Sequence, residues 1–348
     1  MASVRAAGYA RRIIADYDNC IVVMSVLYSL QPVYRPKAQM TRIKHIDIAK
    51  GLGIILVVWG HSQIELGHYI IYMFHMPLFF YLSGIFHKPG AFNVLITKKF
   101  TGLIIPLLIF VILLSPLALF FCKGTLSFSP PHLKGIFGPL WFLISLFILS
   151  LIYHPLLDFR PVVRLSICIT LSFVLGYLPS IYNLENYAYC FTTFSALIFY
   201  AAGNIIGDRF LNRNKRFPQF LAFVVFAFSL IVMYYVCFKY MRYGNTDMYD
   251  NVLPPNFLLF VLSAAAGIGM VLSLSLFISR SSILANIMSL IGECSMYIFA
   301  FHMAVFMISR EYFPHHGLPV EFTLIILSIA FGCCVRPVFK QIAPVIFK

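Results

Sequence analysis

The sequence predicts an all-α, polytopic integral membrane protein with about ten transmembrane helices, each of roughly 20 residues. Of the 348 residues, 61% are hydrophobic and only 11% are charged, and the mean hydropathy is +0.88. Soluble domains carry about 25% charged residues, so lipid must be the solvent of this chain. Its apolar segments are continuous rather than alternating, which excludes a transmembrane β-barrel. Helices satisfy their backbone hydrogen bonds internally, so they are the expected spanning elements.

Ten apolar segments are expected to span the bilayer. Two of them, 68–87 and 283–308, contain polar interruptions. In chain order the predicted spans are 46–64, 68–87, 101–121, 137–154, 161–178, 190–207, 217–238, 257–278, 283–308 and 319–336.

Lysine and arginine are unevenly distributed over the connections between these spans. Sixteen fall on the side where the first span begins, and five fall on the other side. The positive-inside rule then predicts that both termini are cytoplasmic. It also explains the net charge of +14 without a nucleic-acid partner. The longest connection on the far side, 239–256, carries Asp, Asn and Tyr residues that either bind a polar acceptor or form a solvated loop.

The first 39 residues do not follow the membrane pattern. They are basic, and their apolar run CIVVMSVLYSL has eleven residues, which is too short to span. We expect residues 1–39 to be a poorly ordered extension or an upstream mis-start, and residues 40–348 to form the membrane domain. The eight cysteines include no C-x-x-C pair and lie mostly in apolar runs, so we expect buried thiols and no metal site.

The first span carries Lys50 near its start and His61 near its end, in the stretch IDIAKGLGIILVVWGHSQ. Eleven helical residues rise roughly 16 Å through almost three turns, so both side chains lie on one face, about half a hydrocarbon thickness apart. Glu65 follows four residues after His61 and is expected on the same face, where it would orient the imidazole. This pair is a candidate general base. The alternative is a structural histidine that is hydrogen-bonded to a neighbouring helix.

Three other spans place a polar or amphipathic side chain at a depth similar to that of His61. These residues are His75, Trp141 and His302. Ionisable groups inside a span are costly, so their shared depth predicts a substrate-side site. Structural alternatives exist for each of them. His75 lies beside the helix-kinking Pro77, Trp141 suits an interfacial belt, and His302 suits a hydrogen-bonded core.

Lys98 and Lys99 lie at the opposite, cytoplasmic face. Together with Lys50 they are candidates for a site that holds an anionic ligand such as a diphosphate. The alternatives are positive-inside anchors at Lys98 and Lys99, and a structural ion pair between Lys50 and Asp47.

Five short motifs occur in the order and spacing of the membrane-bound acyltransferase 3 family, which the chain resembles over residues 46–308. In that family a basic residue and a histidine are separated by ten residues in the first span, and here these are Lys50 and His61. The second motif, FHMPLFFYLSGIFHK, is similar to the branch that includes fucose O-acetylases. The remaining motifs are GPLWFL, FYAAGNIIG and IGECSMYIFAFH.

The resemblance implies a membrane-embedded O-acyltransferase in the bacterial plasma (inner) membrane. Acetyl-CoA, the acyl donor, would approach from the cytoplasm, with its phosphates held by Lys50, Lys98 and Lys99, and no cofactor would be bound permanently. The acceptor would be a saccharide hydroxyl at the outer face, in an exopolysaccharide, an O-antigen or a lipid-linked sugar. His61 would act as general base or as a transient acyl carrier.

The chain departs from the family pattern at one position. Many members carry two arginines, spaced by two residues, before a proline that here is Pro106. The corresponding residues are Lys99 and Gly102. Lysine binds phosphate as a point charge without the arginine fork, and Gly102 supplies no cation, so the second charge of that phosphate site is missing.

Two other classes of function fit the same pattern of residues. A secondary transporter would move a polar or acidic substrate past His61 and His75, with proton-coupled flux and no acetylated product. The sequence lacks the paired broken helices that are typical of such transporters. A non-enzymatic membrane partner in polysaccharide assembly would tolerate the loss of His61.

Overall fold

The computed structural model describes residues 43–65, 67–121, 128–129, 132–133, 135–211, 219–240, 246–312, 317–344 and 346. From Ile43 onward these residues belong to one unit, and they are almost entirely helical, which confirms the all-α class. The predicted extension, 1–39, lies outside the described residues.

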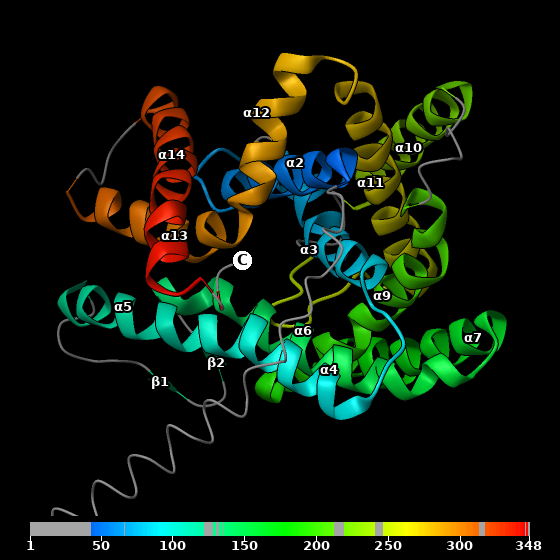
Figure 1. Ribbon diagram of the computed structural model, residues 1–348. Coiled ribbons are helices and arrows are strands. Elements are labelled where there is room, and N and C mark those ends of the chain that lie inside the picture. Colours follow the sequence, from blue (N-terminus) through cyan, green and yellow to red (C-terminus); the bar gives the residue numbers. More distant parts are fainter. Residues whose placement is uncertain are drawn as a thin grey trace, which may run out of the picture. The chain divides into compact units, whose positions relative to one another are not determined.

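Helices follow one another along the whole of this unit (Figure 1). The α-helices are α2 (Lys44–Gly60), α3 (His68–Ile85), α4 (Phe92–Lys99), α5 (Ile105–Phe121), α6 (Trp141–Tyr153), α7 (Pro161–Leu171), α8 (Leu178–Ile181), α9 (Cys190–Leu211), α10 (Gln219–Tyr240), α11 (Phe257–Ile278), α12 (Ser282–Glu293), α13 (Ser295–Tyr312) and α14 (Leu318–Ile342). Short 3₁₀ or π segments extend several of them: η1 (Phe100–Ile104), η2 (Gly135–Leu140), η3 (His154–Asp158), η4 (Ser172–Tyr177) and η5 (Tyr187–Tyr189). Two antiparallel strands of two residues each, β1 (Phe128–Ser129) and β2 (His132–Leu133), precede η2.

Each of the ten predicted spans falls mainly on helix within the described residues. The first, 46–64, is four residues too long, because α2 ends at Gly60. Seven helical segments are long and apolar enough to cross a membrane, and there are eight if α12 and α13, which meet at 72°, form one broken span. That break coincides with the polar interruption predicted in 283–308. The two remaining predicted spans are α2 and α3, so the count of ten stays a prediction. The chain is a polytopic membrane protein.

Other helices surround α2 and α3 on several sides. α2 contacts α3, α11, α12, α13 and α14, and α3 contacts α2, α9, α10 and α11. Their polar side chains therefore face protein, where partners and cavities exist, rather than lipid. In contrast, α10 exposes large apolar side chains such as Phe220, Phe228 and Tyr234 to the surroundings, as expected of a lipid-facing helix.

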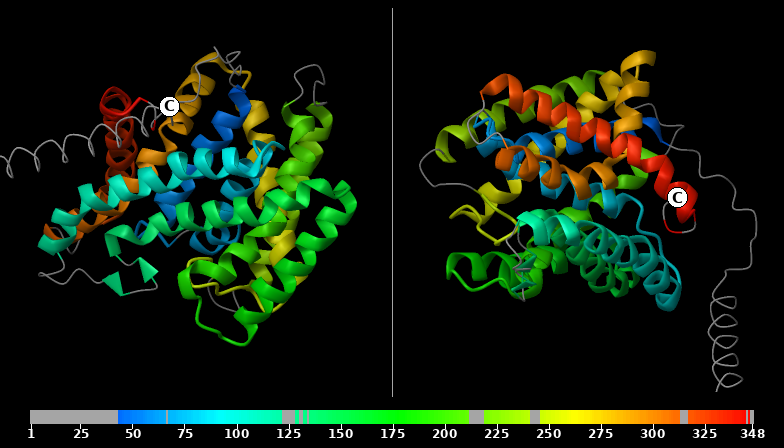
Figure 2. Two further views of the ribbon diagram at one scale, coloured as in Figure 1. Left: turned by 60° about the horizontal axis from the view of Figure 1, so that its bottom comes forward. Right: turned by 90° about the vertical axis from the view of Figure 1, so that its left-hand side faces the viewer.

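Glycines allow α2 and α3 to touch their main neighbours backbone to backbone. A Cβ at Gly292 of α12 would overlap the carbonyl oxygen of Asp47 in α2, and a Cβ at Gly84 of α3 would overlap that of Tyr200 in α9. Small residues bring membrane helices together in this way. The helices α13 and α14, which also contact α2, lie side by side in Figure 2. Close packing against α12 and α9 thus fixes α2 and α3, which carry Lys50, His61 and His75.

Candidate active site

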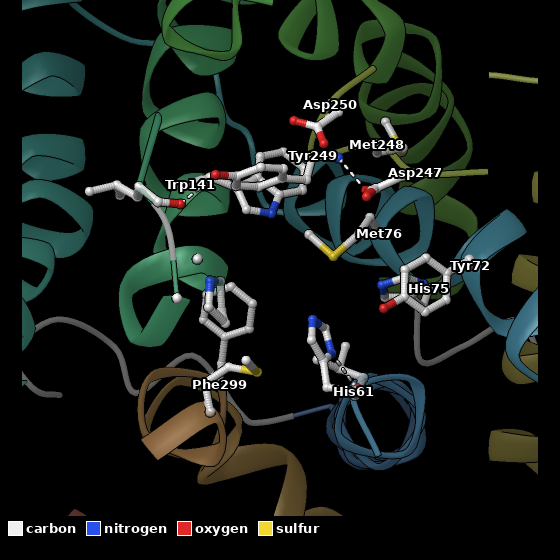
Figure 3. A pocket seen from close by; sticks show the side chains of 16 residues that line it. His61, Tyr72, His75, Met76, Trp141, Asp247, Met248, Tyr249, Asp250 and Phe299 are labelled. Carbon is white, nitrogen blue, oxygen red and sulfur yellow. Dashed lines mark hydrogen bonds between the residues drawn. The ribbon is translucent and has the colours of Figure 1, made fainter. Parts of the chain in front are cut away.

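A cavity of about 400 Å³ lies at the C-terminal end of α2, between α2, α3, α13, the η2–α6 junction and the loop 246–253 (Figure 3). We call it the histidine cavity. Three of the residues predicted to share one depth line it together, namely His61, His75 and Trp141. His302 is not part of the lining, but its ring centroid lies 5.0 Å from that of His61. The structure therefore brings together the side chains of four separate spans.

The His61 imidazole has a defined orientation. It follows the last residue of α2, and its Nδ1 lies 2.8 Å from the Val57 carbonyl oxygen. A carbonyl oxygen only accepts, so Nδ1 carries the ring hydrogen and Nε2 is the free acceptor of the neutral ring. Figure 3 shows this second nitrogen directed into the cavity. The geometry suits a base, or a nucleophile, that acts on a group bound there.

The predicted helical pairing of Glu65 with His61 is wrong. Because α2 ends at Gly60, the two residues do not share a helical face. Glu65 is exposed and does not line the histidine cavity. The carbonyl of Val57, one turn before His61, occupies the orienting position that we expected Glu65 to fill.

His75 and His302 have the same ring orientation as His61. Their Nδ1 atoms lie 2.8 Å from the Ile71 oxygen and 2.9 Å from the Phe299 oxygen, respectively. Both are buried, and the Nε2 of His302 has no hydrogen-bond partner among the described residues. In all three imidazoles Nδ1 is thus held by a backbone carbonyl. At His61 and His302 the other nitrogen, Nε2, is a free acceptor.

Three other helices hold the backbone around His61. The Tyr72 hydroxyl of α3 donates to the Gly60 carbonyl at 3.0 Å, and the Arg310 guanidinium of α13 donates to the His61 carbonyl at 2.8 Å. The Glu321 carboxylate of α14 accepts the Gln63 N–H at 3.0 Å. Carbonyls at a helix C-terminus lack intrahelical partners, and here distant side chains satisfy them. Sequence analysis missed Arg310 and Glu321 because they are about 250 residues away and no local pattern marks them.

The far wall of the histidine cavity is aromatic and acidic. The Trp141 ring packs 6.4 Å from the Tyr249 ring, and the Tyr249 hydroxyl donates to the Leu133 carbonyl at 2.5 Å. Asp247 and Asp250 also line the cavity. Asp247 is fixed by the Tyr249 N–H, 2.8 Å from Oδ1, and burial raises the pKa of its carboxyl to about 6. The described part of the 239–256 connection therefore forms part of the wall of the histidine cavity.

A second cavity, of about 350 Å³, lies beside α4 and the loop that joins α3 to α4. We call it the lysine cavity. Lys98 and Lys99 line it, with Lys88, Gly102 and two histidines that sequence analysis did not single out, His87 and His154. No carboxylate is among its lining residues. The arrangement suits an anionic ligand.

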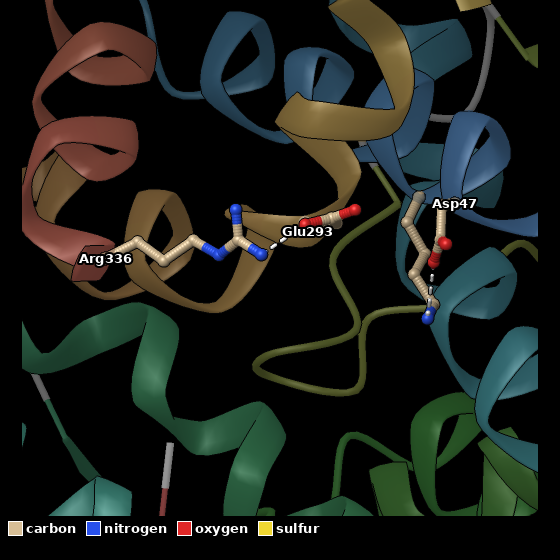
Figure 4. A network of polar contacts seen from close by, with 4 residues as sticks. Asp47, Glu293 and Arg336 are labelled. Carbon is tan, nitrogen blue, oxygen red and sulfur yellow. Dashed lines mark hydrogen bonds and ion pairs between the residues drawn. The ribbon is translucent and has the colours of Figure 1, made fainter. Parts of the chain in front are cut away.

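Lys50 lies next to the lysine cavity rather than in its wall. Its Nζ is 3.4 Å from Asp47 Oδ1 and 5.1 Å above the ring of Phe86, which does line the cavity. The ion pair that sequence analysis gave as the alternative is therefore present (Figure 4). In the same region Arg336 of α14 pairs with Glu293 at the end of α12. Lys50 can reach an anion only by exchanging or sharing its partner Asp47.

Comparison with known families gives one match that covers most of the chain. Residues 43–336 match the model of a family described as an acyltransferase domain. The match begins just before α2 and ends in α14, so it includes both cavities. Comparison with curated proteins gave no match.

Proposed function

The chain belongs to the acyltransferase 3 family, and from this membership and the two cavities we propose that it transfers an acetyl group from acetyl-CoA to a saccharide hydroxyl. The observation that carries the proposal is the His61 imidazole, whose Nε2 faces the histidine cavity while Nδ1 is held by the Val57 carbonyl. A positioned histidine with a free acceptor nitrogen is the usual general base at neutral pH.

The lysine cavity is the proposed donor site. Lys98 and Lys99 would bind the diphosphate of acetyl-CoA, with Lys50 beside them behind Phe86. Lys50 lies in the second turn of α2 and His61 directly follows its last residue, and eleven residues of helix cover roughly 16 Å. The thioester arm of the donor would extend over that distance along α2. We propose that the lysine cavity faces the cytoplasm and the histidine cavity faces outward, as the positive-inside rule suggests.

The chemistry can be written at His61 Nε2. The imidazole removes the proton of the acceptor hydroxyl while the hydroxyl oxygen attacks the thioester carbonyl. The tetrahedral intermediate collapses, the C–S bond breaks, and the leaving thiolate takes the proton back from Nε2. In the covalent variant Nε2 itself attacks the thioester carbonyl, the C–S bond breaks and the thiolate leaves. The acceptor hydroxyl oxygen then attacks the acetyl carbon and displaces the imidazole, while the hydroxyl proton passes to the thiolate. Both variants need the same free nitrogen.

The wall opposite His61 suits a sugar. The faces of Trp141 and Tyr249 offer apolar surface for the C–H face of a pyranose, and Asp247 offers an acceptor for its hydroxyls. This supports a saccharide of an exopolysaccharide, an O-antigen or a lipid-linked sugar, including a fucose-containing one. No feature of the described residues favours the alternative of a secondary transporter.

The test of this function is mass spectrometry of the surface glycans of cells that carry the gene, lack it, or have it restored. We expect one acetyl-sized mass increment that disappears on deletion and returns on restoration. The position of the increment identifies the acceptor sugar. Identical glycans in all three strains would refute the saccharide acceptor.

Arg310→Ala is expected to lower kcat by roughly 10- to 100-fold and to leave the donor KM within about twofold. The guanidinium holds the His61 carbonyl, and a small displacement of a reacting group costs up to about 10²-fold in rate. Steady-state kinetics with acetyl-CoA and an isolated acceptor measures both constants. Added guanidinium ions should restore part of the kcat, and Arg310→Lys should retain more activity than Arg310→Ala. A raised donor KM with normal kcat would contradict this positioning role.

Acceptor binding is expected to depend on pH through Asp247. Burial raises the pKa of this carboxyl to about 6, so it is protonated below that pH and ionised above it. The ionised form makes the stronger hydrogen bond to a hydroxyl, so the acceptor KM should fall roughly fivefold as pH rises from 5 to 7.5. Acceptor KM measured over this range in the wild type and in Asp247→Asn tests it. The amide variant should show no such step, and an equal step in both proteins would assign it to another group.

A further inference from the structure

A continuous chain of hydrogen bonds runs along the wall of the lysine cavity. The Tyr200 hydroxyl lies 2.6 Å from His87 Nδ1, His87 Nε2 lies 3.0 Å from His154 Nδ1, and His154 Nε2 lies 2.9 Å from the Gly90 carbonyl oxygen. His87 and Tyr200 are buried, and His154 is partly exposed. The chain therefore connects the core to the α3–α4 loop that forms part of the cavity.

The Gly90 carbonyl fixes the positions of the hydrogens along these hydrogen bonds when both imidazoles are neutral. Because a carbonyl only accepts, His154 donates from Nε2, and its Nδ1 is left as an acceptor. His87 must then donate from Nε2 to His154, and its own Nδ1 accepts from the Tyr200 hydroxyl. With neutral rings only this arrangement satisfies all three contacts.

One additional proton exchanges the donor and acceptor roles in the His154–His87 and His87–Tyr200 hydrogen bonds, and no heavy atom has to move. When His154 carries a hydrogen on both nitrogens, Nε2 still donates to Gly90 and Nδ1 donates to His87 Nε2. The hydrogen of His87 then resides on Nδ1 and donates to the Tyr200 oxygen, since a hydroxyl also accepts. The added charge is placed on His154, which is the member of the chain that lines the cavity and is partly exposed.

The charged side chains that face the pair, among the described residues, are basic. The basic groups that face it are Lys88 in the same loop, Lys98 and Lys99 in α4, and Arg164 in α7, whose guanidinium lies 5.7 Å from the Tyr153 ring. The titratable hydroxyls that face it are those of Tyr153 and Tyr200, whose rings lie 5.3 Å and 5.6 Å from the His87 ring. No carboxylate lines the cavity among the residues that the structure describes. A bound anion would reverse the sign of the local field and favour the imidazolium.

We propose that His87 and His154 belong to the donor site and that binding of an anionic diphosphate there is accompanied by uptake of one proton on His154. The inference rests on the proposed function, since it takes the donor to be a nucleotide-linked diphosphate. The proton comes from solvent and is carried as the second N–H of the His154 imidazole. The cavity thereby gains a further cation next to Lys88, Lys98 and Lys99 at the moment the anion arrives.

Titration calorimetry of the full-length protein in detergent tests the proposal, with coenzyme A as the probe. The titration is run at pH 8.0, where the phosphates of the probe are fully ionised, in HEPES and in Tris, whose ionisation enthalpies differ. The dependence of the observed heat on buffer gives the number of protons taken up. We expect an uptake in the wild type that exceeds that of His154→Gln by nearly one proton, with binding retained in the variant. His45→Gln, at a histidine of α2 that lines neither cavity, is the matched control and should keep the wild-type value.

A second measurement covers the case in which His154→Gln does not fold. For the wild type alone, uptake of one proton requires the Kd of coenzyme A to rise up to about tenfold per pH unit between pH 7.5 and 8.5. Binding with no proton uptake and a Kd independent of pH would overturn the histidine proposal and leave the donor site intact. Absence of any binding heat would instead refute the lysine cavity as the donor site.

Discussion

His61→Ala is expected to lower acetyl transfer by roughly 10³-fold while the protein still inserts and folds. General base catalysis contributes about 10²- to 10⁴-fold, and His61 supplies the nitrogen that both chemical variants require. The side chain is only partly buried at the end of α2, so its removal leaves the helix contacts in place. The measurement is the transfer of labelled acetyl from acetyl-CoA to acceptor glycan in membranes that contain equal amounts of each protein.

The matched control is His45→Ala, a histidine in the first turn of the same helix that lines neither cavity. It should keep near wild-type activity. An inserted His61→Ala protein with full transfer would falsify the role of His61. Incubation with labelled acetyl-CoA in the absence of acceptor then distinguishes the two chemical mechanisms. A label retained on the wild-type protein and lost in His61→Ala indicates a covalent acetyl-imidazole. An unlabelled but active wild type indicates a general base.

Sequence analysis predicted the features that depend on helix depth and order. His61, His75 and Trp141 line one cavity because residue count along three separate helical segments predicted a similar depth for them. Lys98 and Lys99 line the second cavity for the same reason. Depth was therefore sufficient to group these residues by the cavity that they line.

The features that sequence analysis missed depend on where a helix ends and on which helices touch. Glu65 was misplaced because α2 ends at Gly60, five residues earlier along the chain, with no proline to mark the end. Arg310 and Glu321 reach the His61 turn only because α13 and α14 pack on α2. Such contacts join residues from opposite ends of the chain, and no spacing within a single segment encodes them.

Replacement of both Lys98 and Lys99 by alanine is expected to raise the acetyl-CoA KM by about 100-fold with little change in kcat at saturation. Hydrogen bonds to charged groups contribute about 1.5–3 kcal/mol each, and screening by solvent reduces this at an exposed group. Lys98 is exposed and Lys99 is partly buried, so Lys99→Ala should account for most of the effect. The measurement is initial rate against acetyl-CoA concentration for both single variants and the double variant.

Gly102 allows the same site to be tested by adding a charge instead of removing one. A Cβ at Gly102 would meet no atom within 4 Å, so a longer side chain enters open space in the wall of the lysine cavity. Gly102→Arg should therefore lower the acetyl-CoA KM roughly fivefold, because the guanidinium fork binds phosphate oxygens in pairs. Gly102→Ala adds the Cβ without the charge and should leave KM unchanged, and Gly102→Glu should raise it. If the three variants had the same KM, phosphate would not bind in this cavity. The expectation that the lysine variants change KM and leave kcat normal would then lose its basis.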